Sequence, residues 1–187
     1  ENAGATVHRV NFGGDVGLHV AKALWGMVTD LGGELPEKLS EIEVGQRSEW
    51  MARCYQAGTA AYEDDEQAQL DITTINKKIY DFHTLDDKSS PLAQMYWTCR
   101  EWSYAYFDEF YARIGTTFEK YYPESETAPL GLKTVQEHIG DVYEESDGAI
   151  VFKGEEHGLH TRVFINKNGL PTYEAKDVGL ALKKWQD

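Results

Sequence analysis

The chain has 187 residues, of which 41% are hydrophobic and 27% charged, a composition typical of a globular protein rather than a disordered one. No apolar run approaches the ~20 residues that span a bilayer, so we expect no transmembrane segment and no membrane partner. The 18 Lys and Arg residues against 32 Asp and Glu residues give a formal net charge of −14. This charge repels phosphate backbones, so we expect the chain not to hold DNA or other nucleic acid by itself.

Residues 1–5 contain neither a Met nor the basic and apolar regions of a signal peptide, which favours a piece of a longer protein. Cys54 and Cys99 are too few and too far apart for a disulfide framework or a zinc site. We therefore expect two buried, reduced thiols in a cytoplasmic protein.

Residues 1–33 have the pattern of a strand followed by a helix. Residues 6–11 alternate like a short strand and lead into a glycine-rich turn at 12–17. Apolar residues then recur at helical spacing from Leu18 to Val28, until Gly32 and Gly33 end the helix. This order is the first half of a strand–helix–strand unit.

Residues 34–146 are predicted to be almost entirely helical. Pro91 suits the first turn of a helix capped by Ser90, and Pro123 and a break at 129–131 are expected to separate the later helices. Three apolar stripes are expected to face a core. They consist of Ala68, Ile72, Ile75 and Ile79; of Leu92, Met95, Tyr96, Cys99, Trp102, Tyr106, Phe110 and Ile114; and of Leu132, Val135, Ile139 and Val142.

Residues 147–187 return to a mixed pattern. Runs at 148–152 and 161–165 predict strands, and 166–169 predicts a turn. Thr172 is expected to cap a helix from Tyr173 to about Lys184. With strand-like ends and a helical middle, the chain is predicted to be an α/β protein, helix-rich overall, in which a parallel sheet carries a large helical insertion.

Asp15 is a candidate binding residue because it lies in the turn between strand and helix, where open α/β sheets bind ligands. The turn matches neither a dinucleotide-binding nor a phosphate-binding loop. The alternative, in which Asp15 only caps the helix that starts near Gly17, stays open at this point.

Tyr173 and Asp177 are four residues apart, so they stack on one face of their predicted helix. A carboxylate beside a phenol is a receptor for a cation, and a desolvated guanidinium bound there would gain roughly 1.5–3 kcal/mol. From the spacing alone, the simpler interpretation is favoured: Tyr173 packs on the sheet and Asp177 faces water.

Two histidine-containing segments resemble functional motifs, but a structural interpretation is favoured for both. His157 and His160 stand beside two glutamates, but a polar loop is the favoured interpretation over a metal site, and we predict no metal ligands. His138-Ile139-Gly140 imitates the start of a nucleotide-binding signature. We expect it to lie inside an amphipathic helix, with Ile139 in the apolar stripe.

Taken together, residues 1–33 and 147–187 resemble parts of arginyl-tRNA synthetases. Residues 10–17 resemble the Asn-(Tyr/Phe)-x-Gly-Asp-x-Gly segment of that family. Residues 148–152, 162–165 and 169–177 resemble its second-half signature, in which a Gly-Ala-x-x-Phe strand leads to a Gly-x-Pro-Thr-Tyr-x-x-x-Asp helix. Between them, weaker similarities to the insertion region of the family occur at Phe107-Asp108, at Glu124-Ser125, and at Gly131 with Val135.

The resemblance implies a Rossmann-like class I synthetase catalytic domain. Residues 1–33 would be its first strand–helix part, 34–146 the helical connective insertion, and 147–187 the second-half strands and arginine-site helix. Such an enzyme activates L-arginine with ATP and Mg²⁺ and transfers it to tRNA(Arg). The resemblance places Tyr173 and Asp177 around the arginine side chain, which overturns the simpler interpretation for them, and implies that Asn11 and Asp15 border the same site.

The sequence also departs from the family. His-Ile-Gly-His would lie before residue 1 and the Lys-Met-Ser-Lys-Ser loop after residue 187, His19 replaces a usual Gln, and Lys176 replaces a frequent Arg. We therefore expect a fragment that is inactive alone, holds no ATP or Mg²⁺ by itself, and meets tRNA(Arg) mostly through parts outside this chain. Two alternatives remain: an acidic helical module that docks basic partners, and an arginine-binding paralogue without catalysis.

Overall fold

The computed structural model describes residues 3–186. Residues 1, 2 and 187, which the sequence assigns to the first and last zones, lie outside the described residues. The chain forms two compact units. One contains the residues up to Arg9 together with Gly14–Glu119, and the other contains Val10–Gly13 together with the residues from Lys120 onward. The boundaries predicted after residues 33 and 146, which divide the chain into three segments, stay a prediction.

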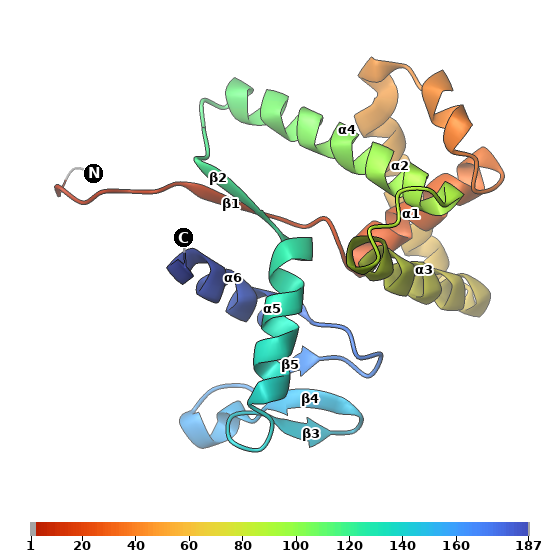
Figure 1. Ribbon diagram of the computed structural model, residues 1–187. Coiled ribbons are helices and arrows are strands. Elements are labelled where there is room, and N and C mark those ends of the chain that lie inside the picture. Colours follow the sequence, from red (N-terminus) through yellow and green to blue (C-terminus); the bar gives the residue numbers. More distant parts are fainter. Residues whose placement is uncertain (1–2, 187) are drawn as a thin grey trace. The chain divides into compact units, whose positions relative to one another are not determined.

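The first unit is a helical bundle (Figure 1). Its elements are α1 (Leu18–Leu31), the 3-10 turns η1 (Pro36–Glu41) and η2 (Val44–Gln46), α2 (Arg47–Asp64), α3 (Glu66–Thr84) and α4 (Pro91–Arg113). Gly32 ends α1 in the left-handed conformation, with φ 79°, and Pro91 opens α4 directly after Ser90. The predicted start and end of α1 and the start of α4 are thus confirmed.

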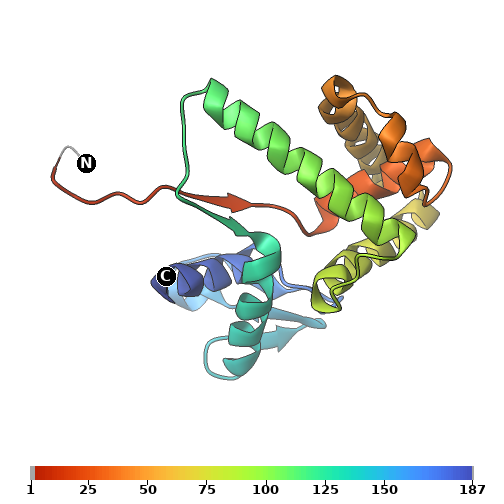
Figure 2. The same cartoon turned by 45° about the horizontal axis from the view of Figure 1, so that its top comes forward.

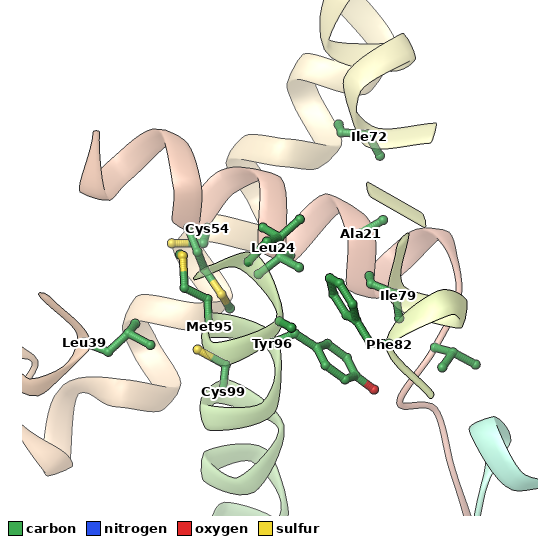
Figure 3. Packing of buried hydrophobic residues seen from close by; sticks show 14 of the residues in the cluster. Ala21, Leu24, Leu39, Cys54, Ile72, Ile79, Phe82, Met95, Tyr96 and Cys99 are labelled. Atoms are coloured by element: carbon green, nitrogen blue, oxygen red, sulfur yellow. The ribbon is translucent and has the colours of Figure 1, made fainter. Parts of the chain in front are cut away.

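The core of this unit is apolar and contains both cysteines (Figure 3). Leu24, Ile72 and Met95 are almost fully buried there. Cys54 and Cys99 are free and buried, as predicted. Burial raises the pKa of the Cys54 thiol to about 11 and that of Cys99 to about 12, so both remain protonated and pack as small apolar groups.

Helices α1 and α2 cross with their backbones almost in contact. A Cβ atom added at Gly26 would lie 2.1 Å from the carbonyl oxygen of Cys54, and one added at Gly58 would lie 2.0 Å from that of Lys22. The two contacts are reciprocal and one helical turn apart, so the helices run antiparallel. Glycine is therefore required at both positions by the close approach of the partner helix.

The apolar stripe predicted along α4 is buried over only half its length. Leu92, Met95, Tyr96 and Cys99 belong to the core, whereas Tyr106, Phe110 and Ile114 are 46%, 42% and 57% exposed. The prediction is wrong for this second half, whose side chains lie outside the buried core of the unit. The exposed rings pack on one another instead; Tyr106 and Phe110, for example, are stacked at 6.4 Å.

The second unit combines two small sheets with two helices (Figure 2). Its elements are β1 (Val10–Gly13), β2 (Lys120–Pro123), α5 (Glu124–Glu137), β3 (Glu144–Ser146), β4 (Ala149–Phe152), η3 (Gly154–His157), β5 (Arg162–Ile165) and α6 (Tyr173–Gln186). Strand β1 begins at residue 10 rather than 6, since its parallel partner β2 has only four residues. The expectation of a single parallel sheet is wrong for β4 and β5, which are antiparallel to each other in a separate sheet.

Helices α5 and α6 repeat the reciprocal glycine contact seen in the first unit. A Cβ atom at Gly131 would lie 1.8 Å from the carbonyl oxygen of Ala175, and one at Gly179 would lie 2.1 Å from that of Thr127. Val135 and Ala175 are fully buried beside this crossing. The close contact attaches α6 to α5, which matters because α6 carries two of the predicted site residues.

Helix α5 differs from the prediction at Pro129, in its interior, and at its C-terminal end. Pro129 lies inside the helix and does not break it, because the helix loses only one backbone bond there and keeps its packing on α6. The helix ends at Glu137, before the positive φ of Gly140, so His138-Ile139-Gly140 forms a turn and Ile139 is 41% exposed. The apolar stripe predicted through Ile139 and Val142 is therefore wrong beyond Val135.

Candidate functional site

Three of the four predicted site residues lie in the second unit. Asn11 is in β1, opposite Tyr121 of β2. Tyr173 is the first residue of α6 and Asp177 lies one turn further along the same helix. The fourth, Asp15, belongs to the helical unit.

The start of α6 is anchored to the edge of β5. The Thr172 hydroxyl donates to the carbonyl oxygens of Val163 at 2.6 Å and Phe164 at 3.1 Å. The Thr172 backbone N–H donates to the same Phe164 oxygen at 2.9 Å. Thr172 was predicted to cap α6: its carbonyl oxygen accepts from the Lys176 N–H at 3.2 Å, while its hydroxyl donates to β5 and fastens the strand to the start of the helix.

Tyr173 is 59% exposed, and its ring rests against Phe12 of β1 with the ring centroids 5.9 Å apart. Strand β1 thus supports one side of the tyrosine ring while much of the phenol remains open to solvent. An exposed tyrosine held by another aromatic ring is suited to contact a ligand with little loss of side-chain freedom.

Asp177 is exposed on the surface of α6. Partial burial raises the pKa of its carboxyl group, and the nearby carboxylate of Glu174 raises it further. Both effects disfavour the negative charge, so a bound cation would relieve them. Tyr173 and Asp177 together present a hydroxyl and a carboxylate on one helical face.

Between these two residues, Lys176 points into the interior of the unit. Its Nζ atom lies 2.6 Å from Oε2 of Glu124, and the two side chains are only 7% and 5% exposed. Glu124 is the first residue of α5 and directly follows β2. This buried ion pair joins the site helix to the end of the parallel strand pair.

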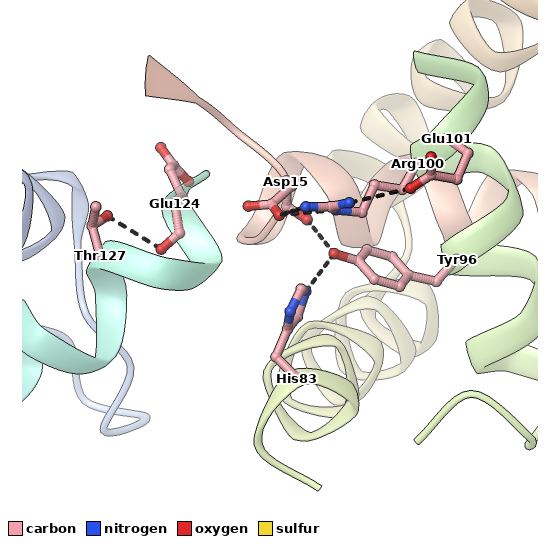
Figure 4. Close-up of polar contacts among 7 residues, drawn as sticks. All are labelled: Asp15, His83, Tyr96, Arg100, Glu101, Glu124 and Thr127. Atoms are coloured by element: carbon pink, nitrogen blue, oxygen red, sulfur yellow. Dashed lines mark hydrogen bonds and ion pairs between the residues drawn. The ribbon is translucent and has the colours of Figure 1, made fainter. Parts of the chain in front are cut away.

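Asp15 is buried and binds a guanidinium of the protein's own chain (Figure 4). Its Oδ2 atom accepts from Arg100 Nε at 3.0 Å and Nη2 at 2.9 Å. The N-cap position of α1 is occupied by Gly17, so the alternative in which Asp15 is the N-cap residue is wrong. The pair instead fastens the glycine-rich turn to α4.

A second bond from α4 holds the backbone of the same turn. The Tyr96 hydroxyl donates to the Asp15 carbonyl oxygen at 2.9 Å and also lies 2.6 Å from Nε2 of His83 (Figure 4). Because the single hydroxyl proton goes to the carbonyl, the Nε2–H of His83 is the donor to the tyrosine oxygen. Burial lowers the pKa of His83, which favours the neutral imidazole over the charged one.

Sequence reasoning missed Arg100, Tyr96 and His83 as partners of the turn, and Glu124 as the partner of Lys176. The partners of Asp15 lie 81 or more residues away along the chain, so no local pattern connects them. One signal was present: Lys176 falls between Ala175 and Gly179 on the buried face of an amphipathic helix, where a lysine needs a partner.

The described residues contain no group of three or more His, Cys, Asp or Glu side chains that could hold a metal ion. His157 is the last residue of η3 and His160 lies in the segment that follows it; both are exposed, and the Thr161 hydroxyl donates to the Glu155 carboxylate beside them. Within residues 3–186, no helix is both long and apolar enough to cross a membrane.

The fold matches a class I aminoacyl-tRNA synthetase of known structure. The crystal structure of arginyl-tRNA synthetase from Plasmodium falciparum superposes with a TM-score of 0.61 at 19% identity, covering 95% of this chain and 27% of that one. The predicted fold class is thereby confirmed: the chain is helix-rich with small sheets and has the fold of part of a class I synthetase.

Curated proteins named arginine–tRNA ligase match almost the whole sequence. The protein from Bdellovibrio bacteriovorus is 28% identical over 186 residues, which cover 99% of this chain and 31% of the relative. The protein from Amoebophilus asiaticus is 27% identical over 199 residues, with 99% and 33% covered. No family model matches the chain. The predicted resemblance is confirmed: the chain is similar throughout to one segment of these ligases and spans about a third of their length.

Proposed function

We propose that this chain forms the arginine-binding part of an arginyl-tRNA synthetase. Tyr173 and Asp177 contact the guanidinium group of L-arginine, and Asn11 borders the pocket from β1. The observation that carries the proposal is the exposed phenol and carboxylate on the first two turns of α6, at the positions where the sequence matches the family signature. Asp15 also stays a prediction from the resemblance; its carboxylate binds Arg100.

The chemistry of the pair suits arginine. A guanidinium is planar and offers parallel N–H donors to a carboxylate, whereas the ammonium of lysine has no such fork. Citrulline has nearly the shape of arginine but no charge, so it would leave the Asp177 carboxylate unpaired. Selection against both amino acids thus follows from one carboxylate and one hydroxyl.

In the full-length protein, arginine is activated with ATP and Mg²⁺ to the adenylate with release of pyrophosphate, and then esterified to the 3′ end of tRNA(Arg) in the cytoplasm. We place the groups that hold ATP and Mg²⁺, and most contacts to tRNA, in other parts of that protein. The role proposed for this chain is to bind and orient the arginine side chain, and the chain alone is inactive.

The test is ATP–pyrophosphate exchange by the full-length protein with arginine, lysine and citrulline. We expect arginine to support exchange and the other two to be about 10⁴-fold less efficient, because a desolvated carboxylate left without its partner is costly. Exchange with a different amino acid would contradict the proposal. If arginine raised the melting temperature without any exchange, a non-catalytic paralogue would be indicated. Binding only to basic peptides, with strong salt dependence, would indicate an interaction module.

A further inference from the structure

The Glu124–Lys176 ion pair is unusual for its surroundings because both charges are buried. Other ion pairs of this unit, such as Lys133 with Glu137, lie on the surface. Withdrawing two charges from water is costly, and apolar residues of similar volume often replace such a pair without loss of stability. Stability alone therefore does not account for an ion pair at this position.

The crossing of α5 and α6 does not need the pair to hold it together. The reciprocal contacts of Gly131 and Gly179 already bring the two backbones together, and Val135 and Ala175 are fully buried beside them. The ion pair adds a preferred orientation. A hydrogen-bonded charge pair restricts the rotation of one helix about its axis, relative to the other helix, more narrowly than apolar packing does.

The proposed arginine receptor, formed by Tyr173 and Asp177, depends on how α6 is rotated about its axis. Successive residues of a helix are separated by a fixed angle, so holding Lys176 inward also sets the directions of Tyr173 and Asp177. Glu124 directly follows β2, and β2 pairs residue by residue with β1. The ion pair thus connects the receptor helix to the strand whose Phe12 supports the Tyr173 ring at 5.9 Å.

We propose that Glu124 and Lys176 are positioning residues that set the rotation of α6 about its axis, so that the face carrying Tyr173 and Asp177 stays beside Phe12 of β1 and is presented to a guanidinium group. This inference rests on the function proposed above and names residues that act on the substrate only through others. It separates two properties of α6: its attachment to the unit, supplied by the glycine crossing, and its orientation, supplied by the ion pair.

The experiment compares variants of the full-length protein by arginine-dependent ATP–pyrophosphate exchange and by melting temperature. Lys176→Met leaves Glu124 buried without its partner, so it is expected to lower the melting temperature and raise the KM for arginine at least tenfold. Lys176→Arg keeps the charge pair and is expected to restore the KM to within threefold of the original. Lys184→Met, an exposed lysine of the same helix, is the matched control and leaves both quantities unchanged.

The decisive variant removes both charges, as Glu124→Leu with Lys176→Met. We expect its melting temperature to return to that of the unmodified protein while the KM for arginine stays raised at least tenfold and the KM for ATP is unchanged. If the double variant regained both stability and the original arginine KM, the pair would be purely structural and the inference would be overturned. If the unmodified protein showed no arginine-dependent exchange, the proposed function would fail, and this inference with it.

Discussion

Replacing Asp177 with alanine in the full-length protein is expected to lower kcat/KM for arginine in ATP–pyrophosphate exchange by about 10²- to 10³-fold. Removing one partner of a desolvated charge pair leaves the guanidinium without its acceptor, at a cost of about 3–4 kcal/mol. The carboxylate lies on the exposed face of α6, away from the crossing with α5, so the fold should be unaffected. The KM for ATP is expected to stay the same.

Two further variants make this result specific. Asp177→Asn keeps the size of the side chain and removes its charge, and it should lose nearly as much efficiency as the alanine variant. Glu156→Ala removes an exposed carboxylate from the η3 loop of the same unit and should have no effect. Near-normal efficiency of Asp177→Ala would contradict the assignment of the arginine receptor.

The second large effect concerns stability. Gly58→Ala would place a methyl group 2.0 Å from the Lys22 carbonyl oxygen, and both groups belong to helix backbones that cannot yield separately. Helices α1 and α2 would have to move apart, exposing the core around Leu24. We expect a loss of about 3 kcal/mol in the free energy of unfolding, measured by urea denaturation.

Gly45→Ala is the matched control for this prediction. A Cβ atom at Gly45 meets nothing within 4 Å, and its backbone is not in the left-handed region. Its stability should be unchanged or slightly increased, because alanine reduces the freedom of the unfolded chain. Equal stability of the Gly58 and Gly45 variants would show that helices α1 and α2 can accommodate a methyl group where they cross.

Apolar periodicity predicted the helices well where a stripe ends in the core. It placed the stripe of α3 and the first half of that of α4 correctly, but the same pattern continues to Ile114, where the apolar side chains are exposed. Periodicity reports which face of a helix is apolar and does not report whether another element covers that face. Strand β2 was not predicted because its four residues, a lysine, two tyrosines and a proline, show no alternation of apolar and polar side chains.

In the candidate site too, local sequence patterns predicted some features and missed the contacts between residues far apart in the sequence. Tyr173 and Asp177 could be predicted as site residues from the sequence because a local signature contains both, and their role stays a prediction. The pairs Asp15–Arg100 and Glu124–Lys176 join residues 85 and 52 positions apart, so only the folded chain brings them together. Asp15 illustrates the difference: the sequence offered a ligand or a helix cap, whereas the structure pairs its carboxylate with an arginine of α4.

The most direct test of the central claim is a crystal structure of the full-length protein with bound L-arginine. We expect the guanidinium group on α6, with two of its nitrogens within about 2.7–2.9 Å of the Asp177 carboxylate oxygens and the Tyr173 hydroxyl in contact with it. Arginine bound elsewhere, with Asp177 facing solvent, would contradict the account.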